Sequence, residues 1–245
     1  MEREQKQLKW KIETHSHTVA SGHAYSTMLE NAKVAAERGM EILCITDHGP
    51  AMADSAHIMH FKNFRVLERT LLGVEMMYGA ELNILDFNGT LDIEERIMKM
   101  MDYIIVGFHP VVIAPGSRSE NTRATIGAIN NPHISTITHP EDGYVPIDYE
   151  AVVKEAVRCN VLIELNNNSL KTATFRLNVR ENLITILKLC EKYGAMVSLG
   201  SDAHFASAVG DFTQCTELLD ELRFPDELII NASPEMFRKH VNSKR

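Results

Sequence analysis

The amino-acid sequence predicts an α/β protein in which seven strands form a TIM-like (β/α)7 barrel. Three observations favour this fold. Seven apolar runs alternate with stretches of helical spacing along the chain. Polar residues that are able to bind metals follow the ends of most of these runs. No linker rich in Pro, Gly or Ser divides the 245 residues, so residues 1–245 are expected to form a single domain.

The apolar runs have the length and composition of buried parallel strands, and they occupy residues 8–14, 42–46, 74–80, 103–108, 134–138, 161–165 and 196–199. Between them, residues 27–38 and 179–192 show helical spacing. Each of these two stretches is followed by a glycine, Gly39 or Gly194, as is common just past the end of a helix. Alternating strands and helices imply a parallel sheet, either open or closed into a barrel.

The distribution of the polar motifs favours the closed sheet. In a barrel, functional groups come from the C-terminal ends of many strands, whereas an open doubly wound sheet gathers them at one switch point. Here a motif follows nearly every strand-like run. The stretch 49–72 breaks the alternation, and we expect it to form a long loop and a helix over the mouth of the barrel.

Composition excludes several classes of function. The formal net charge is -8 and no block of Lys or Arg occurs, so the chain would attract a nucleic acid poorly and none is expected as a partner. The N-terminal residues are polar and charged, and no run is long enough to span a membrane. The four cysteines show no CxxC spacing, which is typical of a protein of the reducing cytoplasm.

Seven of the eleven histidines, together with two carboxylates, stand in short motifs at the ends of the strand-like runs. In His15-Ser16-His17, residues two apart on a strand point to the same side, so both imidazoles can reach one ion. Asp202 and His204 repeat this spacing, and Glu81 could bridge two ions through its two oxygens. Alone, each of these residues would more often be a buried structural histidine or a solvated carboxylate. Their joint occurrence predicts a site for more than one metal.

The order of these motifs resembles the PHP superfamily, named for polymerase and histidinol phosphatase, and within it the small stand-alone phosphatases with a trinuclear zinc site. The resemblance covers about residues 10–240 and implies a distorted seven-stranded barrel. The matching motifs are His15-Ser16-His17, Ser21-Gly22-His23, Thr46-Asp47-His48, Gly79-Ala80-Glu81, Gly107-Phe108-His109, Thr138-His139-Pro140, Glu164-Leu165-Asn166-Asn167 and Ser201-Asp202-Ala203-His204.

The resemblance also implies three zinc ions per chain. The first would be held by His15, His17, Glu81 and Asp202, the second by Glu81, His109 and His139, and the third by His23, His48 and His204. Manganese and iron remain alternatives to zinc, because imidazole and carboxylate ligands accept all three metals. Relatives usually have Asp at the position of Glu13, which lies two residues before the first ligand. A homo-oligomer, for example a trimer, is also implied.

The expected function is hydrolysis of a small phosphomonoester by a metal-dependent phosphatase, with a metal-bridging hydroxide as nucleophile. Ser21, Ser26 and Ser201 lie near the motifs, but none has a recognisable base, so they are interpreted as cap or turn residues. In the stretch 49–72, His57, His60 and Arg65 are candidates for binding the substrate, with a solvated loop as the alternative for Arg65.

Three other functions fit the sequence less well. A phosphodiesterase or 3'-5' exonuclease could use the same site, but the chain has no basic, aromatic-lined track for a nucleic-acid strand. A metal-dependent amidohydrolase typically bridges its ions with a carboxylated lysine, and here the fourth strand-like run ends at His109 instead. A binding module with structural zinc would have closed four-ligand sites, whereas nine ligands for three ions leave positions open.

Overall fold

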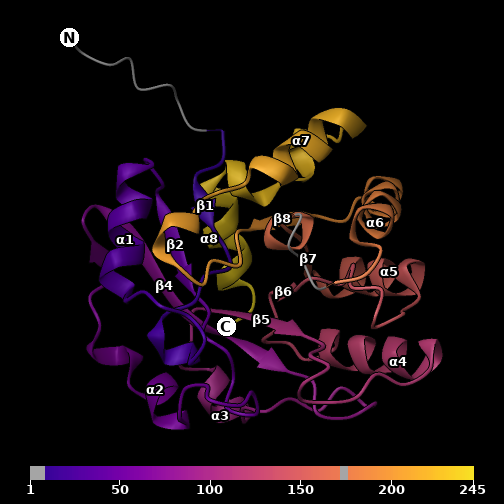
Figure 1. Ribbon diagram of the computed structural model, residues 1–245, viewed down its shortest axis with the longest axis horizontal. Helices are drawn as coiled ribbons and strands as arrows, with labels where there is room; N and C mark the ends of the chain where they lie inside the picture. Colours follow the sequence, from indigo (N-terminus) through magenta and orange to yellow (C-terminus); the bar gives the residue numbers. More distant parts are fainter. Residues whose placement is uncertain (1–8, 172–175) are drawn as a thin grey trace.

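Seven parallel strands form one sheet that curves into a nearly closed barrel, as the sequence predicts (Figure 1). The computed structural model describes residues 9–171 and 176–245. Neighbouring strands follow the order β1-β2-β4-β5-β6-β7-β8, and every pair along this path is parallel. Their bounds are β1 (Ile12–Glu13), β2 (Ile42–Ile45), β4 (Val74–Asn83), β5 (Tyr103–Gly107), β6 (Thr136–Ile137), β7 (Leu162–Asn166) and β8 (Val197–Gly200).

Helices cover the outside of the sheet. In Figure 1, α4, α5 and α6 lie along one side of the barrel, and α1 lies on the opposite side. The α-helices are α1 (Met28–Glu37), α2 (Ile58–Lys62), α3 (Glu95–Met98), α4 (Arg118–Ile129), α5 (Tyr149–Cys159), α6 (Val179–Tyr193), α7 (Thr213–Leu222) and α8 (Pro234–Asn242). Six short 3-10 helices complete the described part: η1 (Val19–Ser21), η2 (Phe64–Val66), η3 (Asn168–Leu170), η4 (Ala206–Ala208), η5 (Asp226–Leu228) and η6 (Ile230–Ala232).

Local sequence signals set the ends of the two predicted helices. The side chain of Thr27 accepts a hydrogen bond from the backbone N–H of Glu30, and the Glu30 carboxylate accepts one from Thr27 N–H, which forms a capping box at the start of α1. Gly194 ends α6 with a φ of 67°, a left-handed conformation that glycine adopts without a steric penalty. Both helices therefore begin and end within two residues of the predicted bounds.

The structure differs from the sequence-based expectation in the lengths of three strands. β1 and β6 each have only two residues, and Leu8, the predicted start of the first strand, lies outside the described residues. β4 continues through Glu81 to Asn83, because pairing with β5 extends past the apolar run that defined the prediction. The stretch 49–72 contains the short helix α2, as expected, and also the antiparallel strand β3 (Thr70–Leu71) beside β4, which the sequence did not indicate.

The barrel is distorted where β1 and β8 meet, because these two strands are not paired as a ladder. A single parallel bridge between Ser16 and Ala203 joins the chain just beyond them. The buried amide of Asn231 fills the gap: its Nδ2 donates to Ile12 O (2.7 Å) and Leu199 O (2.8 Å), and its Oδ1 accepts from Leu199 N–H (2.7 Å). One side chain from η6 thus satisfies backbone groups that a closed sheet would pair directly.

Glu13 joins the same two strand ends from the other side of the gap. Its buried carboxylate accepts hydrogen bonds from the backbone N–H groups of His15 and Ser201, each 3.0 Å, and of Gly210, 2.7 Å. Burial nevertheless raises the pKa of Glu13 above its ordinary value. Glu13 therefore has a structural role in holding the ends of β1 and β8 together.

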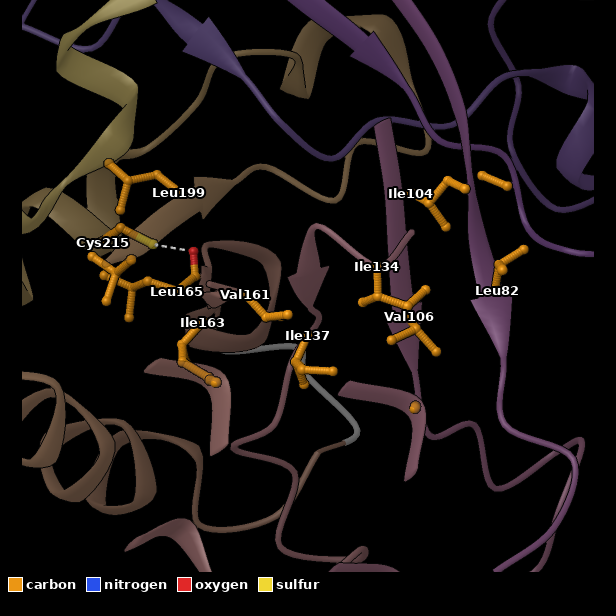
Figure 2. Packing of buried hydrophobic residues seen from close by; sticks show 14 of the residues in the cluster. Leu82, Ile104, Val106, Ile134, Ile137, Val161, Ile163, Leu165, Leu199 and Cys215 are labelled. Carbon is orange, nitrogen blue, oxygen red and sulfur yellow. Dashed lines mark hydrogen bonds between the residues drawn. The ribbon is translucent and has the colours of Figure 1, made fainter. Parts of the chain in front are cut away.

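The two faces of the strands pack into two apolar layers. Residues such as Ile42, Tyr103 and Leu162 point into the barrel and meet Phe237 of α8, whose ring centroid lies 5.1 Å from that of Tyr103. The alternate residues of the same strands pack outward beneath the helices. Figure 2 shows this outer layer, in which the buried thiol of Cys215 donates to Leu165 O at 3.4 Å. The apolar contents close one end of the barrel and leave the C-terminal ends of the strands for polar side chains.

At the closed end, the buried His240 of α8 donates from Nε2 to Ser135 O at 3.1 Å. Burial lowers the pKa of His240 from 6.5 to about 4. The unfolded chain therefore binds a proton between these pH values that the native protein does not, so stability falls as the pH falls through this window. We expect the His240 imidazole to cost roughly 3 kcal/mol between pH 7.5 and pH 4.

Urea unfolding of the wild type and of His240→Gln at both pH values measures this effect. Glutamine keeps a donor for Ser135 O but does not titrate, and every titration that the two proteins share cancels in the difference between them. The difference in unfolding free energy between them should therefore change with pH in favour of His240→Gln under acid conditions. If the unfolding free energies of the two proteins changed with pH in parallel, the lowered pKa of His240 would be contradicted.

Among the helices in residues 9–171 and 176–245, none has the length and apolar character needed to cross a bilayer. Each of the four cysteines is a free thiol, and three of them, Cys44, Cys190 and Cys215, are buried.

Candidate metal centre

The nine predicted ligands come together at the C-terminal end of the barrel. Seven of them are buried with at most 7% of their surface exposed, namely His15, His17, His48, Glu81, His109, His139 and Asp202. His204 is partly buried and His23 is exposed. They are contributed by the segments that follow β1, β2, β5, β6 and β8, and by β4 itself. The cluster therefore uses most strands of the sheet, as expected of a barrel active site.

Four of these side chains direct a ligand atom toward one point. The Nε2 atoms of His15 and His17 lie 2.9 Å apart. Asp202 Oδ1 is 3.6 Å from His15 Nε2 and 3.3 Å from His17 Nε2. Glu81 Oε2 is 3.4 Å and 3.6 Å from the same two nitrogens. This group coincides with the ligand set that the family resemblance implies for the first ion.

The two carboxylate oxygens of Glu81 face different groups of histidines. Oε1 accepts a hydrogen bond from Thr138 Oγ1 (2.9 Å) and lies 2.8 Å from His139 Nε2 and 3.2 Å from His109 Nε2. Oε2 faces His15 and His17, and it also lies 2.8 Å from His48 Nδ1. Glu81 therefore stands between two sets of imidazoles, with one oxygen toward each.

The residues of the third predicted group lie close together, but residues of the other two groups lie equally close to them. The ring of His23 stacks on those of His48 and His204, with centroid distances of 5.0 Å and 4.7 Å. His17 is nearer to the same two rings, at 4.3 Å and 4.4 Å, and its ligand atom lies within 4.8 Å of theirs. His48 likewise forms a compact group with Glu81 and His109. The ligands thus form one continuous cluster.

Neighbouring side chains fix which imidazole nitrogen faces the cluster. Glu164 Oε1 lies 2.6 Å from His15 Nδ1, and because a carboxylate only accepts, Nδ1 carries a proton, so that Nε2 holds the lone pair when the His15 ring is neutral. Asn83 Oδ1 acts in the same way on His109 Nδ1 at 2.7 Å, since the Asn83 amide nitrogen already donates to Gly49 O and Asp92 Oδ2. Such partners are typical of metal-binding histidines.

Two cluster residues have strained backbone conformations. His139 has a φ of 32° and Asp202 a φ of 51°, in the left-handed region that residues with a side chain rarely adopt. Conformations of this kind cost on the order of 1–3 kcal/mol each and concentrate at functional sites. At His139 the strain is partly compensated, because its N–H donates to Glu164 Oε2 at 2.8 Å.

The electrostatics of the cluster keep its carboxylates charged but act differently on its imidazoles. At His15, the lowering effect of burial is outweighed by Glu164, Glu81 and Asp202, which raise its pKa well above the ordinary value. Burial, reinforced by the neighbouring His48 and His204, holds the pKa of His17 well below its ordinary value. Burial alone would raise the pKa of Glu81, but the surrounding imidazoles, His15 first among them, hold it well below its usual range. The same opposition of burial and His15 lowers the pKa of Asp202. Neutral imidazole and charged carboxylate are the protonation states that bind metal.

The donor set and its spacing fit a metal ion. Two ligands about 2.0–2.1 Å from a tetrahedral zinc ion lie roughly 3.3 Å apart. The distances in the first group, 2.9 to 3.6 Å, bracket this value. Moreover, although Glu81 Oε2 and His48 Nδ1 lie 2.8 Å apart, neither of these buried atoms has a hydrogen-bond partner among the described residues. Buried polar atoms of this kind are costly unless something binds them.

Three charged residues that the sequence analysis did not assign to the site lie against it. Glu164 orients His15 as described above. Arg176 is almost completely buried, and its guanidinium lies 3.5 Å from Asp202 Oδ2 and donates to Ser169 Oγ. Glu141 is fully buried, and burial raises its pKa to about 7 even though Arg176 opposes this shift. Of these three residues, only Glu164 stands in one of the sequence motifs that resemble the family. Arg176 follows β7 by ten residues and stands in no motif.

The three candidates for substrate binding lie in the stretch 49–72 but do not share one environment. His57 caps α2 by accepting a hydrogen bond from Met59 N–H, and it is exposed. Arg65 is also exposed. His60 points the other way: its Nε2 lies 3.4 Å from the buried Asp47, and its ring packs edge-on against Phe61 and Phe64. The structure therefore does not bring these three side chains together.

Comparisons with known proteins agree with this geometry. A family model described as "PHP domain" matches residues 13–222. A probable phosphatase of Clostridium novyi is 43% identical over 237 residues, covering 97% of this chain and 96% of the relative. A probable phosphatase of Caldicellulosiruptor saccharolyticus is 44% identical over 226 residues, covering 92% and 93%. In fold, the chain is similar to histidinol phosphate phosphatase from Lactococcus lactis, crystallised with zinc, L-histidinol and phosphate. That match has a TM-score of 0.59, 13% identity and coverage of 88% and 94%.

Proposed function

This chain belongs to the PHP domain family, and on that premise we propose that it is a metal-dependent phosphatase that hydrolyses a small phosphomonoester at a site of three metal ions. Phosphatase activity follows from relatives that match nearly the whole chain and are named probable phosphatases. The small substrate and the number of ions are the finer parts of the proposal, and the geometry of the cluster supports them.

The position of Glu81 is the observation on which the proposal depends most. A buried carboxylate with one oxygen toward His109 and His139 and the other toward His15 and His17 has the arrangement of a bridging ligand. In our proposal, one ion is held by His15, His17, Glu81 and Asp202. A second is held by Glu81, His109 and His139, and a third by His23, His48 and His204. Zinc fits this donor set, with manganese and iron as alternatives.

When bound, such ions would supply Lewis acidity toward a phosphoryl oxygen and would lower the pKa of a coordinated water. The three serines near the motifs are not evident nucleophiles. Ser21, Ser26 and Ser201 are all buried, and their hydroxyls are engaged with Asp47 Oδ1, Ala206 N–H and His15 O respectively. The protein side chains therefore serve to bind, orient and balance charge.

Access to the cluster favours a compact phosphate group. The buried ligands leave His23 and His204 as the more exposed members, so a substrate would approach past these two imidazoles. A phosphomonoester dianion can present three oxygens to a group of cations, whereas a diester has fewer free oxygens and two bulky substituents. This difference favours a monoesterase over the alternative, a phosphodiesterase or 3'-5' exonuclease acting at the same site.

Turnover of matched synthetic substrates tests the proposal. With zinc or manganese present, p-nitrophenyl phosphate should be hydrolysed at least about tenfold faster than bis-p-nitrophenyl phosphate, a difference that corresponds to about 1.4 kcal/mol in activation free energy. Chelation should abolish both activities. Metal analysis of the same sample should give between two and three ions per chain. Preference for the diester or for a single-stranded oligonucleotide would favour the alternative function, and full activity with one ion or none would exclude the trinuclear site.

A further inference from the structure

Asp47, the residue between Thr46 and His48, has a side chain that joins two ligand-bearing segments. Its buried carboxylate accepts hydrogen bonds from Thr18 N–H (2.7 Å) and Ser21 Oγ (2.7 Å) at Oδ1, and from Thr18 Oγ1 (2.8 Å) at Oδ2. These bonds tie the segment that follows β2 to the loop that carries His17 and His23. Asp47 is thus placed to hold ligands from two strand ends in register.

The hydroxyl of Ser21 connects Asp47 to His17. Because this hydroxyl has one proton, it can donate only one of its hydrogen bonds and must accept the others. Ser21 Oγ donates that proton to Asp47 Oδ1, so its other contacts must be made as an acceptor. One of them is the backbone N–H of His48, at 3.1 Å. The other is Nδ1 of His17, at 3.3 Å. His17 must therefore carry its proton on Nδ1, which leaves the lone pair of Nε2 facing His15, Glu81 and Asp202.

His60 reaches the same carboxylate from outside. Its Nε2 lies 3.4 Å from Asp47 Oδ2. The ring makes edge-on contacts with Phe61 of the same helix, α2, and with Phe64 of η2, at centroid distances of 5.1 Å each. Only about a fifth of the His60 side chain is exposed, with a relative accessibility of 22%. The line of contacts therefore runs from the stretch 49–72 through Asp47 and Ser21 to His17.

From these contacts we infer that Asp47 and Ser21 are positioning residues that hold His17 in its Nδ1-protonated tautomer, with Nε2 directed at the metal cluster, and that His60 anchors the stretch 49–72 to the same network. The inference rests on the proposed function in one respect, because it assumes that His17 binds an ion. It assigns to Ser21 a role other than that of a turn residue, and to His60 a role other than contact with substrate.

Ser21→Ala removes the acceptor for His17 Nδ1, and Ser26→Ala is the matched control. Both serines are buried in the same loop, but Ser26 Oγ accepts only from Ala206 N–H. Loss of a partner of a metal-binding histidine typically weakens metal binding by about 10- to 100-fold. We expect this loss for Ser21→Ala in zinc competition against a chromophoric chelator, near-wild-type affinity for Ser26→Ala, and rescue by Ser21→Thr, which restores a hydroxyl.

The tautomer of His17 is a second readout that needs neither metal nor activity. In long-range ¹H–¹⁵N spectra of chelator-treated protein, His17 should be protonated at Nδ1 in the wild type and in Ser26→Ala, and should divide between both tautomers in Ser21→Ala. A wild-type protein that binds no metal would refute the proposed function, yet this spectrum would still test the inference. Equal zinc affinity for Ser21→Ala and Ser26→Ala, or an unprotonated Nδ1 in the wild type, would overturn it.

The role of His60 is tested by measuring KM and zinc affinity separately. His60→Ala should weaken zinc binding several-fold and leave KM for p-nitrophenyl phosphate unchanged, whereas the exposed Met59 of the same helix, replaced by alanine, should change neither quantity. A raised KM for His60→Ala with unaltered zinc affinity would identify His60 as a substrate contact and would refute its role as an anchor. Thermal unfolding of each variant without metal checks that folding is retained.

Discussion

Replacement of Glu81 by glutamine is expected to remove at least two metal ions from each chain and to abolish phosphatase turnover. Glutamine matches the volume of glutamate but carries no charge, and its amide nitrogen cannot serve as a ligand. Because both oxygens of Glu81 face imidazoles, the substitution alters the two sides of the cluster together. Metal ions supply several kcal/mol of transition-state stabilisation, so a loss in kcat/KM of roughly 10³-fold or more is expected.

His23→Ala is the control for Glu81→Gln. His23 is the most exposed predicted ligand, and its ring contacts the rings of His48 and His204. Its loss should therefore empty one position and leave the two ions on either side of Glu81 bound. Elemental analysis of both variants, with circular dichroism to confirm folding, distinguishes the two cases. Full metal content and a wild-type rate in Glu81→Gln would show that the carboxylate does not bridge.

The sequence predicts the barrel well because apolar runs and polar strand ends are local signals. Its errors occur where tertiary contacts override local pattern. β4 continues to Asn83 because Glu81 and Asn83 pair with β5 although both are polar. β3 is a two-residue strand with no alternation of its own, and it exists because Thr70 and Leu71 lie beside β4. No local pattern indicates that an amide from η6, Asn231, fills the gap between β1 and β8.

That the nine candidate ligands lie close together could be predicted from the sequence because each stands in a short motif, but the contacts of the residues around them could not. Glu164 contacts His15 across 149 residues of sequence, and no spacing rule connects them. Arg176 and Asp202 likewise lie 26 residues apart in the sequence, and no local pattern indicates their contact. For His60, the sequence analysis predicted a place near the barrel mouth and named it a candidate for binding the substrate. That its ring faces Asp47 follows from packing against Phe61 and Phe64.

A single guanidinium, that of Arg176, is expected to contribute more to stability than any other charged side chain in the site. Buried carboxylates surround it: Asp202 lies 3.5 Å away, and Glu141, Glu164 and Glu81 each raise the pKa of Arg176, against the opposing effect of burial. Removal of one partner of a buried ion pair costs about 3–5 kcal/mol, because the remaining charge is left uncompensated. Arg176→Met should therefore lower the unfolding free energy by this amount.

Arg180→Met is the matched control, since Arg180 lies in the first turn of α6 and makes an exposed ion pair with Glu221. Exposed pairs of this kind contribute about 0–1 kcal/mol, so the same substitution four residues away should have little effect. The deficit of Arg176→Met should be largest after chelation, because bound cations also offset the buried carboxylates. It should shrink as the pH falls below the pKa of Glu141, about 7, since protonated Glu141 no longer requires a counter-charge. Urea unfolding at pH 8 and pH 6, with and without chelator, measures both trends. Equal stability of Arg176→Met and Arg180→Met in chelator-treated protein would show that the buried carboxylates do not depend on Arg176.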